Sequence, residues 1–271
     1  RSFRSRPIIN VNKKKSGKRA LLSYSTALIK SLKKEIHPNH IEIALINKIL
    51  DQMGYMVDVY NNTDGRRIDY SNYDLIIGEG LPISNYFIGR QFERCQVKTI
   101  YYATGSYPLF QNTATYRRIF DFYHRRGKYL PESGRAIDER WAVGASLSDY
   151  VILIGNETTK RTFEEYRPSE NIFTLNPPVY EIPTIQTDCL KKPNKFLWFG
   201  SYGLLHKGLD IVLETFLARP DVELEVCGFL ENESNLLDIY HEDLEKASNI
   251  HFHGFISIYS EEFNKLVSEC S

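Results

Sequence analysis

A lysine follows two glycines at close spacing in the last third of the chain, directly after a short apolar stretch. The segment reads Phe199-Gly200-Ser201-Tyr202-Gly203-Leu204-Leu205-His206-Lys207-Gly208. Gly200 and Gly203 allow the backbone to turn sharply and to approach a ligand closely. A helix starting at Lys207 would present unpaired N–H groups and a partial positive charge, which bind phosphate, and the lysine adds a full charge. The pattern predicts a phosphate site; a plain strand–helix loop with a surface lysine explains the same residues equally well.

This loop matches neither of two common nucleotide motifs, the Walker P-loop and the Rossmann Gly-x-Gly-x-x-Gly pattern. Its surroundings predict alternating strands and helices: strands at 195–199, 222–227 and 250–253, and helices at 207–217, 233–247 and from 261 onward. Such a series is half of a doubly wound nucleotide-binding domain, in which ligands lie at the carboxyl ends of the strands.

A longer series of the same kind comes earlier in the chain. It predicts strands at 19–25, 55–60, 73–77, 97–103, 149–154 and 172–175, and helices at 41–53, 116–126, 139–146 and 158–166. The alternation favours an α/β fold with parallel sheets covered on both faces. We expect a basic arm at 1–18, a Rossmann-like domain at 19–178, a proline-rich linker at 179–194 and the first half of a second domain at 195–271.

Three segments of the second series resemble the C-terminal domain of GT-B glycosyltransferases, and most of all the retaining family four (glycosyl transferases group 1). They are 196–216, Val226-Cys227-Gly228 and Asn249-Ile250-His251-Phe252-His253-Gly254. The resemblance implies a GT-B type fold, with two Rossmann-like doubly wound domains facing across a cleft. It also implies that the second domain is incomplete in this chain, which stops before the family's acidic Glu-x7-Glu region.

The same resemblance assigns residues to the donor. Lys207 corresponds to the lysine that contacts the donor diphosphate, and it is our candidate catalytic residue. The other expected donor contacts are Gly200, Ser201, Gly203, Gly228, Gly254 and Phe255. Ser201 stands where the family usually has arginine, so one of two expected cations is missing from the loop.

The resemblance places the acceptor against the loops of the first domain. The candidates there are His40, Thr104, Gly105, Asn112 and Arg117. Each has an alternative structural role: the segment around His40 suits an exposed turn before a helix, and the loop after 97–103 suits packing of its aromatic residues. The sequence Gly78-Glu79-Gly80 predicts a tight loop around an acid, with or without a functional role.

Charge and composition exclude several classes of protein. The 34 basic and 34 acidic residues balance, so a nucleic-acid partner is not expected. The four cysteines are far apart and the seven histidines show no ligand spacing, which indicates reduced thiols and no metal site. The first nineteen residues carry only positive charges; such an arm is able to lie on anionic lipid, or is simply solvated. We expect a cytoplasmic protein, with peripheral membrane contact through this arm at the inner face.

The function implied by the resemblance is transfer of a hexose from a UDP- or GDP-linked sugar to a hydroxyl of a glycan or lipid-linked acceptor. It implies retention of configuration, with no metal and no cofactor beyond the nucleotide sugar, and the chain contains no Asp-x-Asp motif. We expect the 271-residue chain alone to transfer little or no sugar. Two alternatives stay open: a nucleotide-sugar epimerase on the same fold, and a non-enzymatic nucleotide- or sugar-binding module.

Overall fold

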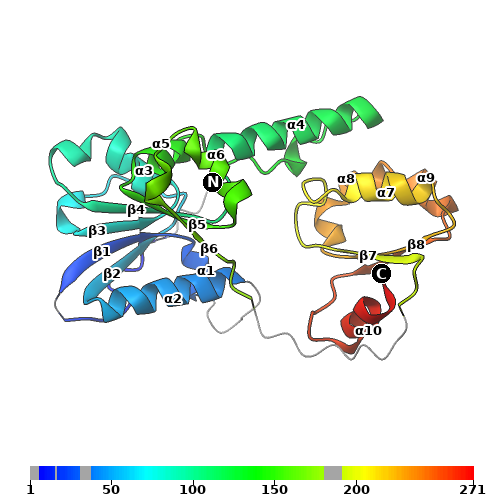
Figure 1. Ribbon diagram of the computed structural model, residues 1–271, viewed down its shortest axis with the longest axis horizontal. Helices are drawn as coiled ribbons and strands as arrows, with labels where there is room; N and C mark the ends of the chain where they lie inside the picture. Colours follow the sequence, from blue (N-terminus) through cyan, green and yellow to red (C-terminus); the bar gives the residue numbers. More distant parts are fainter. Residues whose placement is uncertain (1–5, 16, 31–37, 180–190) are drawn as a thin grey trace. The chain divides into compact units, whose positions relative to one another are not determined.

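The computed structural model describes residues 6–15, 17–30, 38–179 and 191–271. It divides the chain into two units (Figure 1). Unit 1 comprises Arg1–Gln111 and Ile137–Tyr180, and unit 2 comprises Asn112–Ala136 and Glu181–Ser271. Most of the predicted linker, together with Cys189 and His37, lies outside the described residues.

Unit 1 is built on a six-stranded parallel sheet with the order β2-β1-β3-β4-β5-β6. The strands are β1 Lys18–Ser23, β2 Tyr55–Tyr60, β3 Leu75–Gly78, β4 Lys98–Ala103, β5 Tyr150–Ile154 and β6 Ile172–Leu175. The helices are α1 Thr26–Lys30, α2 Pro38–Gln52, α3 Leu81–Ile88, α5 Trp141–Leu147 and α6 Glu157–Glu164. Short 3-10 turns lie at η1 Tyr70–Asn72, η2 Gln91–Glu93 and η4 Ser169–Asn171.

Helices cover both faces of this sheet, as a parallel sheet requires (Figure 1). Leu21 of β1 packs with Ile83 of α3 and Phe163 of α6 on one face. Its neighbours Ala20 and Leu22 pack with the α2 residues Ile43 and Leu50 on the other. Successive strand residues therefore enter two separate cores, which explains why the strands read as apolar runs in the sequence.

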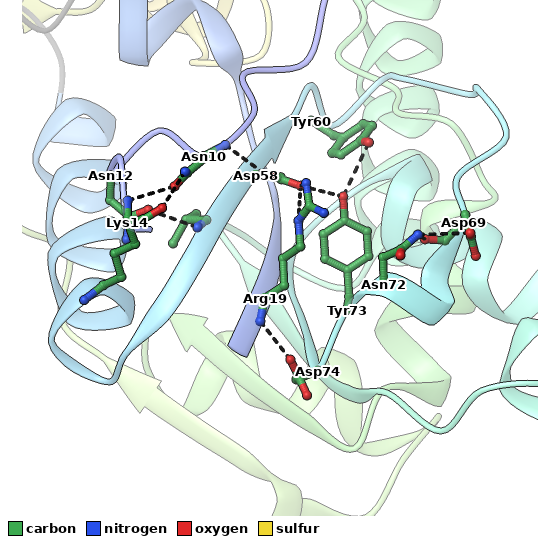
Figure 2. Close-up of polar contacts among 11 residues, drawn as sticks. Asn10, Asn12, Lys14, Arg19, Asp58, Tyr60, Asp69, Asn72, Tyr73 and Asp74 are labelled. Atoms are coloured by element: carbon green, nitrogen blue, oxygen red, sulfur yellow. Dashed lines mark hydrogen bonds and ion pairs between the residues drawn. The ribbon is translucent and has the colours of Figure 1, made fainter. Parts of the chain in front are cut away.

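The predicted basic arm docks on the edge of this sheet, which a solvated arm would not do. The Ile8 and Val59 backbones exchange N–H···O bonds of 2.9 and 2.8 Å, and Lys14 lies 3.3 Å from Asp51. Asp58 of β2, which is fully buried, accepts hydrogen bonds from the Asn10 N–H, the Arg19 Nε and the Tyr73 hydroxyl, each at 2.8 Å. Figure 2 shows these groups converging on the Asp58 carboxylate. The described part of the arm is thus tied to unit 1 by backbone hydrogen bonds to β2, by an ion pair with Asp51 and by the hydrogen bond from Asn10 to the buried Asp58.

Unit 2 contains a three-stranded parallel sheet of β7 Lys195–Phe199, β8 Glu223–Cys227 and β9 Ile250–Gly254. Its helices are α7 Leu209–Leu217, α8 Ser234–Asp238, α9 His241–Lys246 and α10 Glu261–Glu269, and a 3-10 turn, η5, spans Leu230–Glu233. The long helix α4, Pro108–Arg126, and the turn η3, Pro131–Ser133, fall mainly in the interval that belongs to unit 2.

The placement of α4 differs from our predicted domain boundary, because residues 112–136 belong to unit 2 and lie inside the interval 19–178 that we assigned to the first domain. Ile119, Phe122 and Leu130 are buried in the same core as Leu209 and Leu213 of α7. Asp210, also fully buried, forms ion pairs with Arg118 and Arg125 of α4. An apolar face and a buried carboxylate on α7 together hold this segment in unit 2.

Some helices differ from their predicted ranges. The helix expected at 233–247 is broken into α8 and α9 at Tyr240, whose ring is buried and whose hydroxyl donates to Glu214 at 2.8 Å. Helix α3 was not predicted, and α4 begins eight residues earlier than expected, at Pro108, a residue that suits the first turn of a helix. The predicted strands agree with the two sheets to within two residues at each end, and the expected α/β class with parallel sheets is confirmed.

Candidate functional site

Three glycines lie side by side where the strands of unit 2 end. Gly200 follows β7, Gly228 follows β8 and Gly254 ends β9. The Gly200 N–H donates to the Cys227 carbonyl at 2.9 Å, and the Gly228 N–H donates to the Gly254 carbonyl at 2.8 Å. A Cβ at Gly228 would lie 2.7 Å from the Gly200 carbonyl oxygen, so a larger residue would force the two strand ends apart. The glycines thus allow the three strand ends to approach one another closely at this carboxyl edge, where ligands bind in open α/β sheets.

The loop after β7 folds back before its helix begins. Leu204 and Leu205 turn into the core, the Lys207 N–H donates to the Gly203 carbonyl at 2.8 Å, and Gly208 takes a positive φ of 78°. Helix α7 therefore begins at Leu209, two residues after the predicted start at Lys207. Lys207 belongs to the loop, and not to the first turn of the helix.

Lys207 lies beside Ser201. Its Nζ donates to the Ser201 hydroxyl at 2.8 Å. Partial burial lowers the pKa of Lys207, and so does the nearby charge of Arg135, while Glu233 opposes the shift. The pKa of His206 is lowered for the same two leading reasons, burial and then Arg135. Lys207 and Ser201 thus meet at the strand end, in a region of concentrated positive charge.

A carboxylate already occupies part of this loop. Glu233, at the end of η5, accepts hydrogen bonds from the backbone N–H groups of Gly203 and Leu204, the second at 3.0 Å. Successive N–H groups turned toward one anion are a recurrent way of binding phosphate and carboxylate. The loop therefore has an anion site in this structure, and the anion comes from the protein itself. Sequence reasoning missed Glu233, which lies thirty positions away along the chain.

Aromatic rings stand beside the glycine edge. Phe229 stacks on Tyr202 on one side and on Phe255 on the other, with ring centroids 4.8 and 4.4 Å apart. Tyr202 and Phe255 are each more than half exposed. Phe255, a predicted donor contact, thus belongs to a stack of three rings that offers flat faces for a base or a sugar.

A second candidate site lies within unit 1, at the carboxyl end of its sheet. A cavity of about 210 Å³ is lined by residues that include Glu79, Thr104, Gly105, Gln111 and Trp141. Thr104 and Asn62 donate to the two oxygens of the Glu79 carboxyl, each at 3.0 Å. Burial raises the pKa of Glu79, although both hydrogen bonds oppose the shift. The indole Nε1 of Trp141 is buried here without a hydrogen-bond partner among the described residues.

Of the five predicted acceptor residues, three lie in unit 1 and two lie in the interval that belongs to unit 2. Thr104 and Gly105 line the Glu79 cavity, whereas His40, Asn112 and Arg117 do not. His40 is buried in the first turn of α2. Asn112 and Arg117 lie on α4 in the interval that belongs to unit 2, where the adjacent Arg118, rather than Arg117, pairs with Asp210. The signal for Glu79 was the Gly-Glu-Gly sequence, since both glycines adopt positive φ values.

A larger cavity of about 750 Å³ lies away from the glycine edge, near the amino ends of β8 and β9. Arg125 and Arg126 line it, but Glu214 and Asp243 pair with them at 3.0 and 3.2 Å. Both arginines are thus paired within the protein.

Among the described residues, no group of histidine, cysteine and acidic side chains is arranged to hold a metal ion. No described helix is both long and apolar enough to span a membrane. The described cysteines, Cys95, Cys227 and Cys270, are free thiols.

Comparison with known proteins found no matching family model and no match among curated proteins. Similar solved structures include an S. aureus TarM mutant in complex with fondaparinux, α-GlcNAc-glycerol and UDP, with 11% identity and a TM-score of 0.40. The alignment covers 67% of this chain and 33% of the TarM chain.

Two further similar structures are a UDP-N-acetylglucosamine 2-epimerase from Rickettsia bellii and S. aureus MnaA with UDP. The first has 13% identity, a TM-score of 0.45 and coverage of 93% of this chain and 71% of that one. The second has 11% identity, a TM-score of 0.43 and coverage of 94% and 73%.

Proposed function

We propose that the chain belongs to an enzyme that binds a UDP- or GDP-linked sugar at the glycine edge of unit 2 and transfers the sugar to a hydroxyl of a glycan or lipid-linked acceptor. The observation that carries the proposal is the loop after β7. Its backbone N–H groups hold a carboxylate, and Lys207 and Ser201 lie beside it. A site that binds one anion through backbone donors, with a lysine beside it, suits the diphosphate of a nucleotide sugar.

The transfer breaks the bond between the sugar C1 and the β-phosphate oxygen, and the bonding electrons pass to that oxygen. The acceptor oxygen bonds to C1 on the same face, and its proton goes to the departing phosphate. Lys207 stabilises the charge that develops on the diphosphate, an effect typically worth about 3 kcal/mol for one well-placed donor. This proposal assigns no side-chain base and needs no metal or further cofactor.

Within unit 1, we assign acceptor binding to the Glu79 cavity. Thr104, Gly105 and Glu79 line it, and the threonine hydroxyl and the Glu79 carboxyl are groups that hydrogen-bond to a ligand hydroxyl. The cavity is smaller than the roughly 300 Å³ of the smallest drug-sized pockets, so it suits one hydroxyl-bearing ring or the end of a longer glycan.

Calorimetric titration with UDP and GDP tests the donor site. Replacing Lys207 by alanine removes a charge-assisted contact, which should weaken binding of the preferred nucleotide by about 10- to 100-fold. Lys265→Ala, at an exposed position of α10, is the matched control and should bind like the wild type. Equal affinities for wild type and Lys207→Ala would contradict the assignment.

A sugar-nucleotide epimerase is the second candidate, and the Glu79 carboxyl favours it. Burial shifts the pKa of this group upward, toward the range where a carboxyl can exchange a proton in catalysis. Product analysis separates the two: a transferase releases free UDP or GDP and a glycoside, whereas an epimerase returns a new sugar nucleotide. Tight binding with no product from any sugar nucleotide and acceptor would indicate a binding module.

A further inference from the structure

The Lys207 loop lacks a second cation in its own sequence, yet an arginine from another segment lies over it. Arg135 follows η3, in the segment that the structure assigns to unit 2. A Cβ built at Gly203 would lie 3.2 Å from Arg135 Cδ and 3.6 Å from Arg135 Nη1. The arginine side chain therefore packs directly against the loop backbone, at the glycine whose N–H donates to Glu233.

Arg135 and Lys207 are close enough to act on each other electrostatically. The positive charge of Arg135 lowers the pKa of both Lys207 and His206. Like charges held together destabilise one another, unless an anion lies among them. Glu233 is that anion here, because its charge favours the protonated form of Lys207. An arrangement of this kind is typical of sites that bind a more highly charged anion.

The segment that carries Arg135 contacts two helices of unit 2, α4 and α8. A Cβ at Gly134 would lie 2.9 Å from Ile119 Cδ1, so the residue before Arg135 packs against the α4 core. Glu132 accepts a hydrogen bond from Asn235, two residues beyond Glu233. The backbone next to Arg135 is thus held against both α4 and α8, which reduces the ordering that a ligand has to impose on this segment.

We propose that Arg135 supplies the second cation for the diphosphate of a nucleoside diphosphate, in place of the cation missing at Ser201, and that the ligand displaces Glu233 from the N–H groups of Gly203 and Leu204. A guanidinium offers two parallel N–H donors to phosphate oxygens, which a lysine does not. This inference rests on the proposed donor site in unit 2. It adds a residue that the loop sequence does not contain.

The test is calorimetric titration of the 271-residue chain with UDP, UMP and uridine, or with the guanosine series if GDP binds more tightly. Arg135→Gln should weaken diphosphate binding by about tenfold or more and leave nucleoside binding unchanged, because only phosphate contacts are lost. The diphosphate affinity of Arg135→Lys should lie between those of Arg135→Gln and the wild type, because lysine keeps the positive charge without the two parallel N–H donors of a guanidinium. Glu233→Gln should strengthen diphosphate binding, because a neutral side chain competes less for the two N–H groups.

Arg219→Gln is the matched control, since Arg219 is exposed and pairs with Asp221 on the surface of unit 2. Thermal unfolding of each variant shows whether it is folded. Wild-type affinity for the diphosphate in Arg135→Gln, alongside a clear loss in Lys207→Ala, would overturn this inference and leave the proposed function standing. A wild-type chain that binds no nucleoside diphosphate or sugar nucleotide would overturn both. Unchanged binding in Glu233→Gln would refute the displacement of Glu233.

Discussion

Helix α4 provides a direct test of the way the chain divides into units. Phe122 is fully buried among side chains of α7 and α8, and its ring lies 6.5 Å from that of Tyr240. Truncating a buried phenylalanine to alanine removes its transfer free energy and leaves a cavity, and costs about 4 kcal/mol. If 112–136 is part of unit 2, Phe122→Ala should destabilise unit 2 and leave unit 1 almost unaffected.

The two tryptophans make this measurable, because Trp141 lies in unit 1 and Trp198 in unit 2. In Trp141→Phe and Trp198→Phe backgrounds, fluorescence during guanidinium unfolding reports one unit at a time. With a slope of about 4 kcal/mol per molar guanidinium, the Trp198 transition should move down by about 1 M. Phe120→Ala, half exposed on the same helix, should shift either transition by less than about 0.2 M.

A different pattern would refute this assignment of α4. If Phe122→Ala lowers the Trp141 transition and leaves the Trp198 transition in place, then α4 stabilises unit 1, as our sequence boundary implied. Equal shifts of both transitions would mean that the two units unfold together. Only a selective loss in unit 2 agrees with a core shared by α4 and α7.

Three further outcomes are expected. Asp58→Ala leaves Arg19 and the Tyr73 hydroxyl without their buried partner, and should lower the free energy of unfolding of unit 1, measured by Trp141 fluorescence, by about 3 kcal/mol. Asp74→Ala removes an exposed contact and should lower it by less than about 1 kcal/mol. Burial raises the pKa of Glu79, so folding favours its protonated form. The unfolding free energy of the wild type should therefore fall relative to that of Glu79→Gln as pH rises from about 4.3 through the raised pKa. Parallel pH profiles of the two unfolding free energies would contradict this. Burial lowers the pKa of Lys207, so the affinity for a nucleoside diphosphate should begin to decline at a lower pH than it would with a lysine of ordinary pKa. Arginine keeps its charge, so Lys207→Arg should abolish that decline in titrations from pH 7 to about 10.

The features that sequence predicted well are set by neighbours along the chain. Strand ends and the glycines after them depend on local apolar runs and backbone freedom, and Gly200, Gly228 and Gly254 meet because parallel strands end at one edge. Lys207 and Ser201 are six positions apart, so their hydrogen bond is also within reach of local reasoning.

The features that sequence missed depend on long-range packing. The spacing of Ile119 and Phe122 shows that one face of α4 is buried, but not which core receives it; the partners in α7 are about ninety positions away. At the break between α8 and α9, the Tyr240 hydroxyl donates to Glu214 of α7, a long-range contact that helical periodicity does not predict. His40, a candidate acceptor residue, is buried in the first turn of α2, a placement that its position just before the predicted helix did not indicate.

The loop after β7 has no arginine in its own sequence, but the side chain of Arg135, from another segment, packs against it. A phosphate interacts with the charges near it in space, so an arginine at position 201 and an arginine that packs over Gly203 satisfy the same physical requirement. If the second cation is Arg135, its position depends on α4. It therefore also depends on the Asp210 ion pairs and on the core that hold α4 in unit 2. Changes that loosen α4, such as Phe122→Ala, should therefore weaken diphosphate binding as well as stability, although Phe122 is a core residue with no role at the donor loop. A donor site built only from residues of the loop after β7 would show no such coupling.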